Sequence, residues 1–171
     1  MALVSLYLKP TVWEWPTMIE FPRGTHVLFV CNAGINRSPM ACAVFKAKMS
    51  AFKFDCKVEY AALYSAFAGV TPADMWRGVP VARDYNLREY RSRFIGQDGV
   101  YNERTLFFGM DEHVVDGIRG YPRIDEVRVR LFNPPNGVFD PQSAQTGEAF
   151  AACFTQIHTG VDKLIASLDM Q

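Results

Sequence analysis

The feature that most constrains the fold is a short apolar run at residues 27–30, which ends at Cys31 and precedes a helix-forming segment. Consecutive apolar residues of this length are typical of a strand buried on both faces of a parallel sheet. Pro39 is well placed for the first turn of a helix, and apolar residues then recur at helical spacing to about residue 52. A strand, a tight loop and a helix in this order predict one β–α unit of an α/β protein.

The same alternation continues along the chain. Further strands are predicted at residues 58–65, 105–110 and 126–132, and further helices from Pro72 and Asp74, at 85–95, at 111–120 and at 147–168. Strands that alternate with helices favour an α/β fold with a four-stranded parallel sheet and helices on both faces, the doubly wound arrangement. Every second residue of 126–132 is apolar, which predicts an edge strand with one exposed face.

The first 24 residues differ from the rest, because they hold three prolines and two of the three tryptophans without a clear period. We predict an N-terminal extension over residues 1–24, packed on the domain, with a short edge strand near residues 3–8. One domain then spans residues 25–171, a length sufficient for a real core.

Net charge and hydropathy indicate which classes of partner to expect. The net charge is zero, which gives no support for nucleic-acid binding. No apolar stretch reaches the roughly 18 residues that span a bilayer, and the N-terminus lacks the pattern of a signal peptide. We therefore expect a cytoplasmic protein with neither a nucleic-acid nor a membrane partner, and the oligomeric state stays open.

The four cysteines and three histidines are scattered. Without a C-x-x-C pair, neither a zinc site nor a disulfide framework is expected. We interpret Cys42, Cys56 and Cys153 as small buried apolar residues. No metal and no cofactor is expected.

Cys31 and Arg37 enclose five residues that can bend round one tetrahedral anion. The N–H groups of Asn32, Ala33, Gly34, Ile35 and Asn36 would then point inward as a phosphate-binding loop. The helix that follows would place its positive end at the same anion. Arg37 would bind two oxygens of the anion in a bidentate fork, a geometry that lysine lacks.

Cys31 is the candidate nucleophile of this loop. The helix N-terminus, the Arg37 cation and the Ser38 hydroxyl would each favour the thiolate, which is the reactive form of the side chain. The pattern therefore indicates attack by a thiolate on a phosphate ester.

A phosphate ester also needs a general acid for its leaving oxygen. Asp140 is the best candidate, because it follows the last strand and Pro141 fixes the backbone after it. Asp111, at the end of the third strand, is the competing carboxylate, and we interpret it as the N-cap of the following helix.

These motifs together resemble the low-molecular-weight protein tyrosine phosphatase family. The resemblance spans about residues 26–169, and its strongest matches are residues 27–31, Arg37-Ser38-Pro39 and Asp140-Pro141. Chain order supports it, since this family has its cysteine before its acid, whereas the larger tyrosine phosphatases have the acid first.

The resemblance implies a protein tyrosine phosphatase that needs no metal and acts on a phosphotyrosine-containing protein or a small aryl phosphate. It implies that Cys31 forms a cysteinyl-phosphate, that Asp140 protonates the leaving phenolate and later deprotonates water, and that Ser38 stabilises the departing thiolate. It also implies an aromatic pocket rim, for which Phe67 is the first candidate and Tyr64 and Trp76 are weaker ones.

The loop departs from the family pattern in its middle. Ala33 and Gly34 stand where the family has Gly-Asn, and Asn36 stands where it has a second cysteine. Gly34 can adopt the left-handed conformation of the family asparagine at low cost. Tyr90 stands near the place of a family histidine that supports the loop.

Two other functions stay open on the sequence. A catalytically weak domain that binds a phosphoprotein or an anion is suggested by the altered loop. A thiol-dependent arsenate reductase shares this kind of loop but needs a mobile pair of further cysteines, which makes it the weaker alternative.

Overall fold

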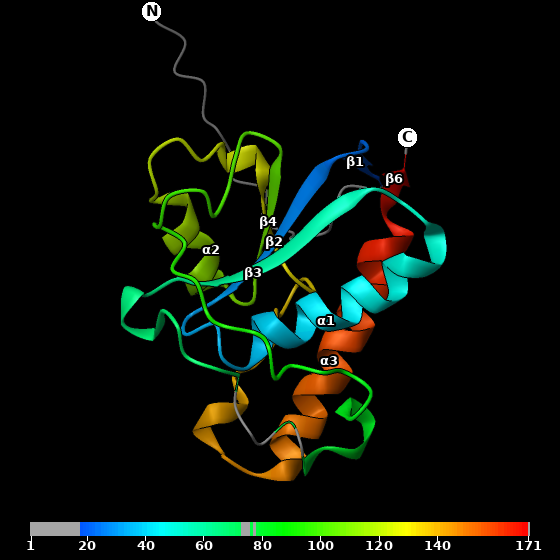
Figure 1. Cartoon of the computed structure of the whole chain (residues 1–171), viewed down its shortest axis with the longest axis vertical. Coiled ribbons are helices and arrows are strands. Elements are labelled where there is room, and N and C mark those ends of the chain that lie inside the picture. The colour runs from blue at the N-terminus through cyan, green and yellow to red at the C-terminus, as the bar shows by residue number, and fades with distance from the viewer. Residues whose placement is uncertain (1–17, 73–75, 77, 171) are drawn as a thin grey trace, which may run out of the picture.

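The computed structural model describes residues 18–72, 76 and 78–170, and its centre is a four-stranded sheet (Figure 1). All neighbouring strands are parallel, and their order is β3-β2-β4-β5. The strands are β2 (Thr25–Cys31), β3 (Cys56–Ala62), β4 (Thr105–Gly109) and β5 (Val129–Leu131). The predicted α/β fold with a four-stranded parallel sheet is therefore confirmed, and β5 is an edge strand as expected.

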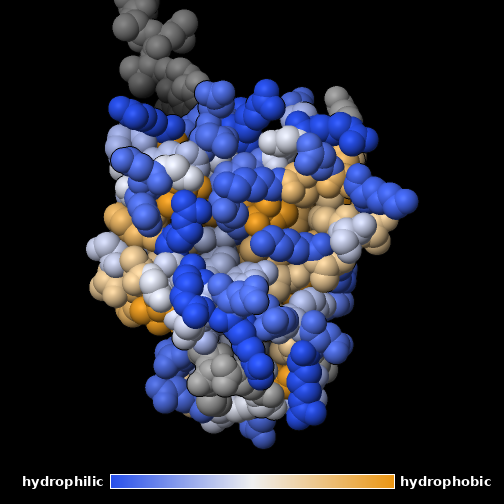
Figure 2. Space-filling model, in the orientation of Figure 1, coloured by the Kyte–Doolittle hydropathy of each residue, from blue (hydrophilic) through white to orange (hydrophobic). Residues whose placement is uncertain are grey.

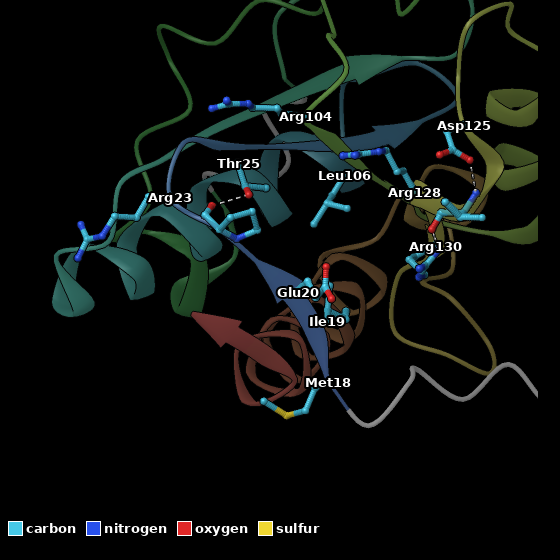
Figure 3. Close-up of a pocket in the computed structure, with 12 residues that line it drawn as sticks. Met18, Ile19, Glu20, Arg23, Thr25, Arg104, Leu106, Asp125, Arg128 and Arg130 are labelled. Atoms are coloured by element: carbon cyan, nitrogen blue, oxygen red, sulfur yellow. Dashed lines mark hydrogen bonds between the residues drawn. The ribbon is translucent and has the colours of Figure 1, made fainter. Parts of the chain in front are cut away.

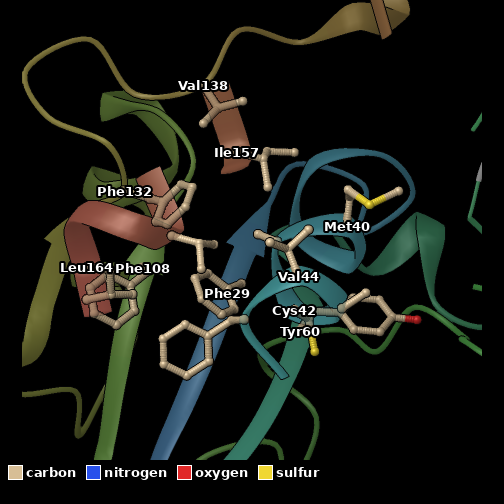
Figure 4. Close-up of a cluster of buried hydrophobic side chains, with 14 of the residues drawn as sticks. Phe29, Met40, Cys42, Val44, Tyr60, Phe108, Phe132, Val138, Ile157 and Leu164 are labelled. Atoms are coloured by element: carbon tan, nitrogen blue, oxygen red, sulfur yellow. The ribbon is translucent and has the colours of Figure 1, made fainter. Parts of the chain in front are cut away.

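Helices cover both faces of the sheet. Successive residues of β2 point to opposite faces, so each face has its own buried cluster. Phe29 packs with α1 (Arg37–Met49) and α3 (Gly147–Ala166) in one cluster of buried side chains. Leu28 packs with α2 (Glu112–Arg119) in the other. The ring of Phe29 lies between 5.4 and 5.6 Å from three other phenylalanine rings, those of Phe45, Phe108 and Phe132. Figure 4 shows Phe29 with Phe108 and Phe132.

A second, two-stranded sheet joins the two ends of the described chain. β1 (Ile19–Phe21) runs parallel to β6 (Leu168–Met170), directly after α3. Phe21 is buried in the same cluster as Phe29, and its ring stacks on that of Phe54 at 5.3 Å. Residues 19–21 thus pack on the domain. The predicted strand at 3–8 lies outside the described residues, and the boundary at residue 24 stays a prediction.

The predicted helix at residues 85–95 is wrong. Residues 92–95 instead run beside the end of β3, where Ala62 N donates to Arg93 O at 2.7 Å and Ile95 N donates to Ala62 O at 2.9 Å. These bonds satisfy backbone groups that would otherwise lie unpaired beside a buried strand end, so tertiary pairing overrides the local helical pattern.

Short 3₁₀ turns replace regular structure at several places. They are η1 (Ser50–Phe52), η2 (Ser65–Phe67), η4 (Pro80–Ala82), η5 (Glu126–Arg128) and η6 (Pro141–Ser143). The predicted strand at 126–132 is therefore shorter than expected, since its first half is η5. Of the helix predicted from Pro72 and Asp74, Asp74 lies outside the described residues.

The face seen in Figure 2 is mostly hydrophilic, with smaller hydrophobic areas between the polar side chains. Among the described helices, none is both long enough and apolar enough to cross a membrane. Within the same residues, no group of three or more histidine, cysteine, aspartate or glutamate side chains is arranged to hold a metal ion.

Candidate active site

The loop between β2 and α1 turns round the Cys31 sulfur. Gly34 has a φ of 62°, the left-handed conformation expected for it, and its N–H donates to Cys31 Sγ at 3.2 Å. Ser38 Oγ lies 3.1 Å from the same sulfur and 3.3 Å from Ala61 O, so its single proton can be donated to either acceptor. One backbone N–H and one hydroxyl thus face the thiol, an arrangement that suits a thiolate.

Arg37 is the most completely enclosed charged side chain of the site, with 2% of its surface exposed. Its Nη1 donates to Asp111 Oδ2 at 2.5 Å and to Val138 O at 3.1 Å, and its Nη2 donates to Asp140 Oδ2 at 3.1 Å. Burial alone would lower the pKa of Arg37. The negative charges of Cys31 and Asp140 and the bond to Asp111 outweigh burial and raise it.

One nitrogen of Arg37 makes no hydrogen bond to the described residues. Its Nε is buried and, within the described part of the chain, has no hydrogen-bond partner. A buried donor without an acceptor is costly, so an acceptor at this position would be bound favourably. Nε and Nη2 form one edge of the guanidinium, which is the edge that binds two oxygens of a phosphate in a bidentate fork.

Asp140 lies at the start of η6, as its position after the last strand predicted. Its Oδ1 accepts from Gln142 N at 3.1 Å, and Pro141 is buried beneath it. Two residues earlier, Val138 N donates to Met110 O at 2.7 Å. The structure thus brings Asp140 to the same guanidinium that ends the cysteine loop, although the two are 103 positions apart.

Asp111 has the predicted position and a second contact that the sequence did not reveal. Its Oδ1 accepts from Val114 N at 2.9 Å, so it is the N-cap of α2. Its other oxygen holds Arg37. Both carboxylates therefore hold the arginine, and their side chains are exposed to a similar extent, 31% for Asp111 and 40% for Asp140. Which of the two acts as the general acid stays a prediction, with Asp140 as the expected residue.

Two contacts to the loop come from residues that the sequence analysis missed. Ser92 Oγ donates to Ala33 O at 3.0 Å, and Asn36 Nδ2 donates to Gln142 Oε1 at 3.0 Å. Tyr90, which the resemblance placed behind the loop, instead stacks on Tyr60 at 5.2 Å. No pattern in the sequence singled out Ser92, because it lay inside a helix predicted wrongly.

The structure corrects part of the predicted aromatic rim, because one of its three candidate residues lies in the core. Trp76 is buried and its ring meets Phe150 edge-on at 4.9 Å, so it belongs to the core and not to a rim. Tyr64 is exposed, its N–H donates to Asn32 O at 3.1 Å, and its hydroxyl lies 2.5 Å from His113 Nε2. Phe67 is half-buried on η2, and its role at the rim stays a prediction.

A separate hollow of about 640 Å³ lies at the amino-terminal ends of β2, β4 and β5, opposite the cysteine loop (Figure 3). It is lined by Arg23, Arg104, Arg128 and Arg130, with Ile19 and Leu106 between them. None of the predicted site residues lies in it. This hollow is therefore not the predicted site.

The fold and the loop place the chain among α/β proteins that hold an anion at the carboxyl end of a parallel sheet, against a helix N-terminus. The family model described as low molecular weight phosphotyrosine protein phosphatase matches residues 26–171. The chain belongs to this family, and the suspected resemblance is confirmed.

Solved structures of similar fold agree with this assignment. The tyrosine phosphatase amsI of Erwinia amylovora has a TM-score of 0.72 and 19% identity, with 85% of this chain and 94% of that chain covered. A protein tyrosine phosphatase of Entamoeba histolytica has a TM-score of 0.70 and 22% identity, with 83% and 95% covered. Wzb of Vibrio vulnificus, solved with benzylphosphonate, has a TM-score of 0.70 and 18% identity, with 82% and 96% covered. Comparison with curated proteins gives no match.

We predict that Gly34→Ala disrupts the loop. Alanine at a φ of 62° is strained, and its Cβ would lie 2.2 Å from Ser92 Oγ. The strain and the clash together should lower the free energy of unfolding by roughly 1–3 kcal/mol, and the Gly34 N–H should lose its bond to Cys31 Sγ. Chemical denaturation and the rate of aryl phosphate hydrolysis measure the two effects.

Gly69→Ala is the matched control, because Gly69 has a φ of 82° but nothing within 4 Å of an added Cβ. It should lose some stability while keeping activity. Adding Ser92→Gly to Gly34→Ala removes the closest clash and should restore part of the lost stability. Equal activity of the Gly34→Ala and Gly69→Ala variants would contradict the predicted loop geometry.

Proposed function

We propose that this protein hydrolyses the phosphate monoester of phosphotyrosine, or of a small aryl phosphate, through a cysteinyl-phosphate intermediate. One observation carries the proposal: Arg37 closes the loop that begins at Cys31 and also contacts the Asp140 carboxyl at 3.1 Å. A nucleophile, an anion-binding guanidinium and a carboxyl thus share one small site, which is what phosphoryl transfer to a thiolate needs.

In the first step, the oxygens of the phosphate are held by the loop N–H groups and by the Nε–Nη2 edge of Arg37. The phosphate takes the place of Asp140 on Nη2, which releases the carboxyl toward the leaving oxygen. Cys31 Sγ forms a bond to phosphorus as the phosphorus–oxygen bond to the phenol breaks. Protonated Asp140 gives its proton to that oxygen, so the phenol leaves as a neutral molecule.

In the second step, the Asp140 carboxylate takes a proton from a water molecule as its oxygen attacks phosphorus. The sulfur–phosphorus bond breaks, and the thiolate that leaves is stabilised by Gly34 N–H and the Ser38 hydroxyl. Inorganic phosphate is released, and Asp140 is protonated for the next cycle. The proton given up in the first step is thus regained in the second.

An aryl ester is favoured by two features. Wzb of Vibrio vulnificus, which has the same fold, binds benzylphosphonate, a phosphonate carrying an aromatic ring. In this chain, Tyr64 and Phe67 follow β3 on a segment attached to the loop, since Leu63 N donates to Cys31 O at 2.8 Å. Aromatic side chains beside the loop are suited to contact a phenol ring.

The arsenate reductase alternative finds no support in the cysteines. Cys42 lies within α1, Cys153 within α3 and Cys56 at the start of β3. Burial raises the pKa of the Cys42 and Cys153 thiols to about 12, so neither supplies a thiolate near neutral pH.

The test supplies the wild-type protein with a phosphotyrosyl peptide, or with a phosphoseryl peptide of the same sequence, in the presence of a metal chelator. We expect inorganic phosphate from the phosphotyrosyl peptide alone, and acid-quenched protein should carry phosphate on Cys31 by mass spectrometry. No phosphate release from either the phosphotyrosyl peptide or phenyl phosphate, or release only with an added divalent metal, would overturn the proposal. Tight phosphopeptide binding without release would assign the binding domain that the sequence left open.

A further inference from the structure

Asn36 stands at the N-cap position of α1 but does not cap the helix. Asparagine is among the preferred N-caps because its side-chain oxygen accepts from the first free N–H groups of a helix. Here no such bond forms. Asn36 is buried, with 7% of its surface exposed. Its amide nitrogen donates instead to Gln142 Oε1 at 3.0 Å.

The missing N-cap bond matters for the anion site. An N-cap side chain would cover the N–H groups at the start of α1, which the phosphate needs. Because the Asn36 side chain bonds Gln142 on η6, it does not occupy these groups. The same bond ties the phosphate-binding loop to the turn that carries Asp140.

Gln142 also fixes the carboxyl of Asp140. Gln142 N donates to Asp140 Oδ1 at 3.1 Å, and Ser143 Oγ donates to Asp140 O at 3.1 Å. Asp140 therefore has one oxygen held by the turn, while the other faces Arg37. Arg37 and Met110 also hold the segment that leads into this turn, through Asp140 Oδ2, Val138 O and Val138 N, and the bond from Asn36 adds a contact to the turn itself from the phosphate-binding loop.

We propose that Asn36 and Gln142 form a latch that positions the general acid Asp140 over the phosphate-binding loop. The latch rests on the proposed function, because it acts on the acid of that reaction. Neither residue of the latch is a proton donor itself; both act by holding η6 in place. The structure thus assigns a role to Asn36, the loop residue that departs from the family pattern.

The expected effect follows from the leaving group. A poor leaving group such as phenol depends on protonation by a well-placed acid, whereas p-nitrophenol leaves readily without full protonation. One neutral hydrogen bond is worth about three- to tenfold in rate when it acts only on the transition state. Loss of the latch should therefore lower kcat by about that factor on phenyl phosphate and by clearly less on p-nitrophenyl phosphate.

The experiment compares Asn36→Ala, Gln142→Met and the double variant on both substrates. Methionine keeps the length of glutamine but lacks the amide oxygen. Because both changes remove the same bond, the double variant should be no slower than the slower single variant. Gln97→Ala is the control, since Gln97 is an exposed glutamine on a different segment, and it should match the wild type.

Hydrogen exchange of residues 138–144 provides a second measurement that needs no turnover. Exchange should be faster than in the wild type in both single variants and unchanged in Gln97→Ala. The exchange rates test whether the latch holds η6 even if the wild-type protein hydrolyses no aryl phosphate. That outcome would overturn only the proposed function. Equal losses on the two substrates with unchanged exchange at 138–144 would overturn the latch.

Discussion

Cys31→Ser is expected to lower the turnover of an aryl phosphate by roughly 10⁴-fold or more, the scale on which removal of a covalent nucleophile acts. Serine is close to cysteine in size and can keep the contacts of the sulfur with Gly34 N and Ser38 Oγ. Its hydroxyl is a far weaker nucleophile than a thiolate without an adjacent base. The loop should thus keep its shape while the chemical step is lost, which initial rates and calorimetric binding of inorganic phosphate would measure together.

Cys56→Ser is the matched control, because Cys56 is half-buried at the opposite end of the sheet. It should retain wild-type turnover. Cys31→Ser with unimpaired turnover would contradict the role of Cys31 as nucleophile. Loss of phosphate binding together with turnover in Cys31→Ser would show that the loop had changed shape, contrary to what the geometry predicts.

The sheet could be predicted from the sequence because its strands are marked locally. The run at residues 27–30 is apolar throughout, and β2 is buried along its whole length on both faces. The helix predicted at residues 85–95 is wrong because the structure of this segment is not determined locally. Their helical pattern is local, whereas the bonds that fix residues 92–95 come from Ala62, some thirty positions earlier in the chain, which no periodicity within the segment reveals.

In the candidate site, too, the residues that lie close together in sequence could be predicted, and those that come from distant segments could not. Cys31, Arg37 and Ser38 are neighbours in sequence, so their spacing, together with the strand before them and the helix after them, predicts an anion loop. Ser92 and Gln142 reach that loop across separations of 59 and 106 residues. Such contacts depend on how the segment after β3 and the turn η6 pack on the sheet, and packing of this kind leaves no residue pattern.

Asp140→Asn is expected to lower kcat by about 10²- to 10⁴-fold on a phenyl ester, the range that general acid catalysis supplies. Asparagine has nearly the same shape, and its one side-chain oxygen can still accept from Gln142 N, while its amide nitrogen replaces the oxygen that accepts from Arg37 Nη2, a contact that the phosphate displaces in the proposed first step. It has no acidic proton to give to the leaving oxygen. The loss should therefore shrink as the phenol becomes more acidic, and a series of substituted aryl phosphates measures this dependence.

Asp111→Asn separates the acid from its neighbour, because Asp111 contacts the same guanidinium at 2.5 Å. Asp111 orients Arg37 and caps α2, so its replacement should weaken phosphate binding and lower the rate by a similar factor for every leaving group. Only the Asp140 variant should show a loss that grows as the leaving group becomes poorer. If that dependence followed Asp111 instead, the proton donor would be the carboxylate at the end of β4, and η6 would serve only to hold the loop.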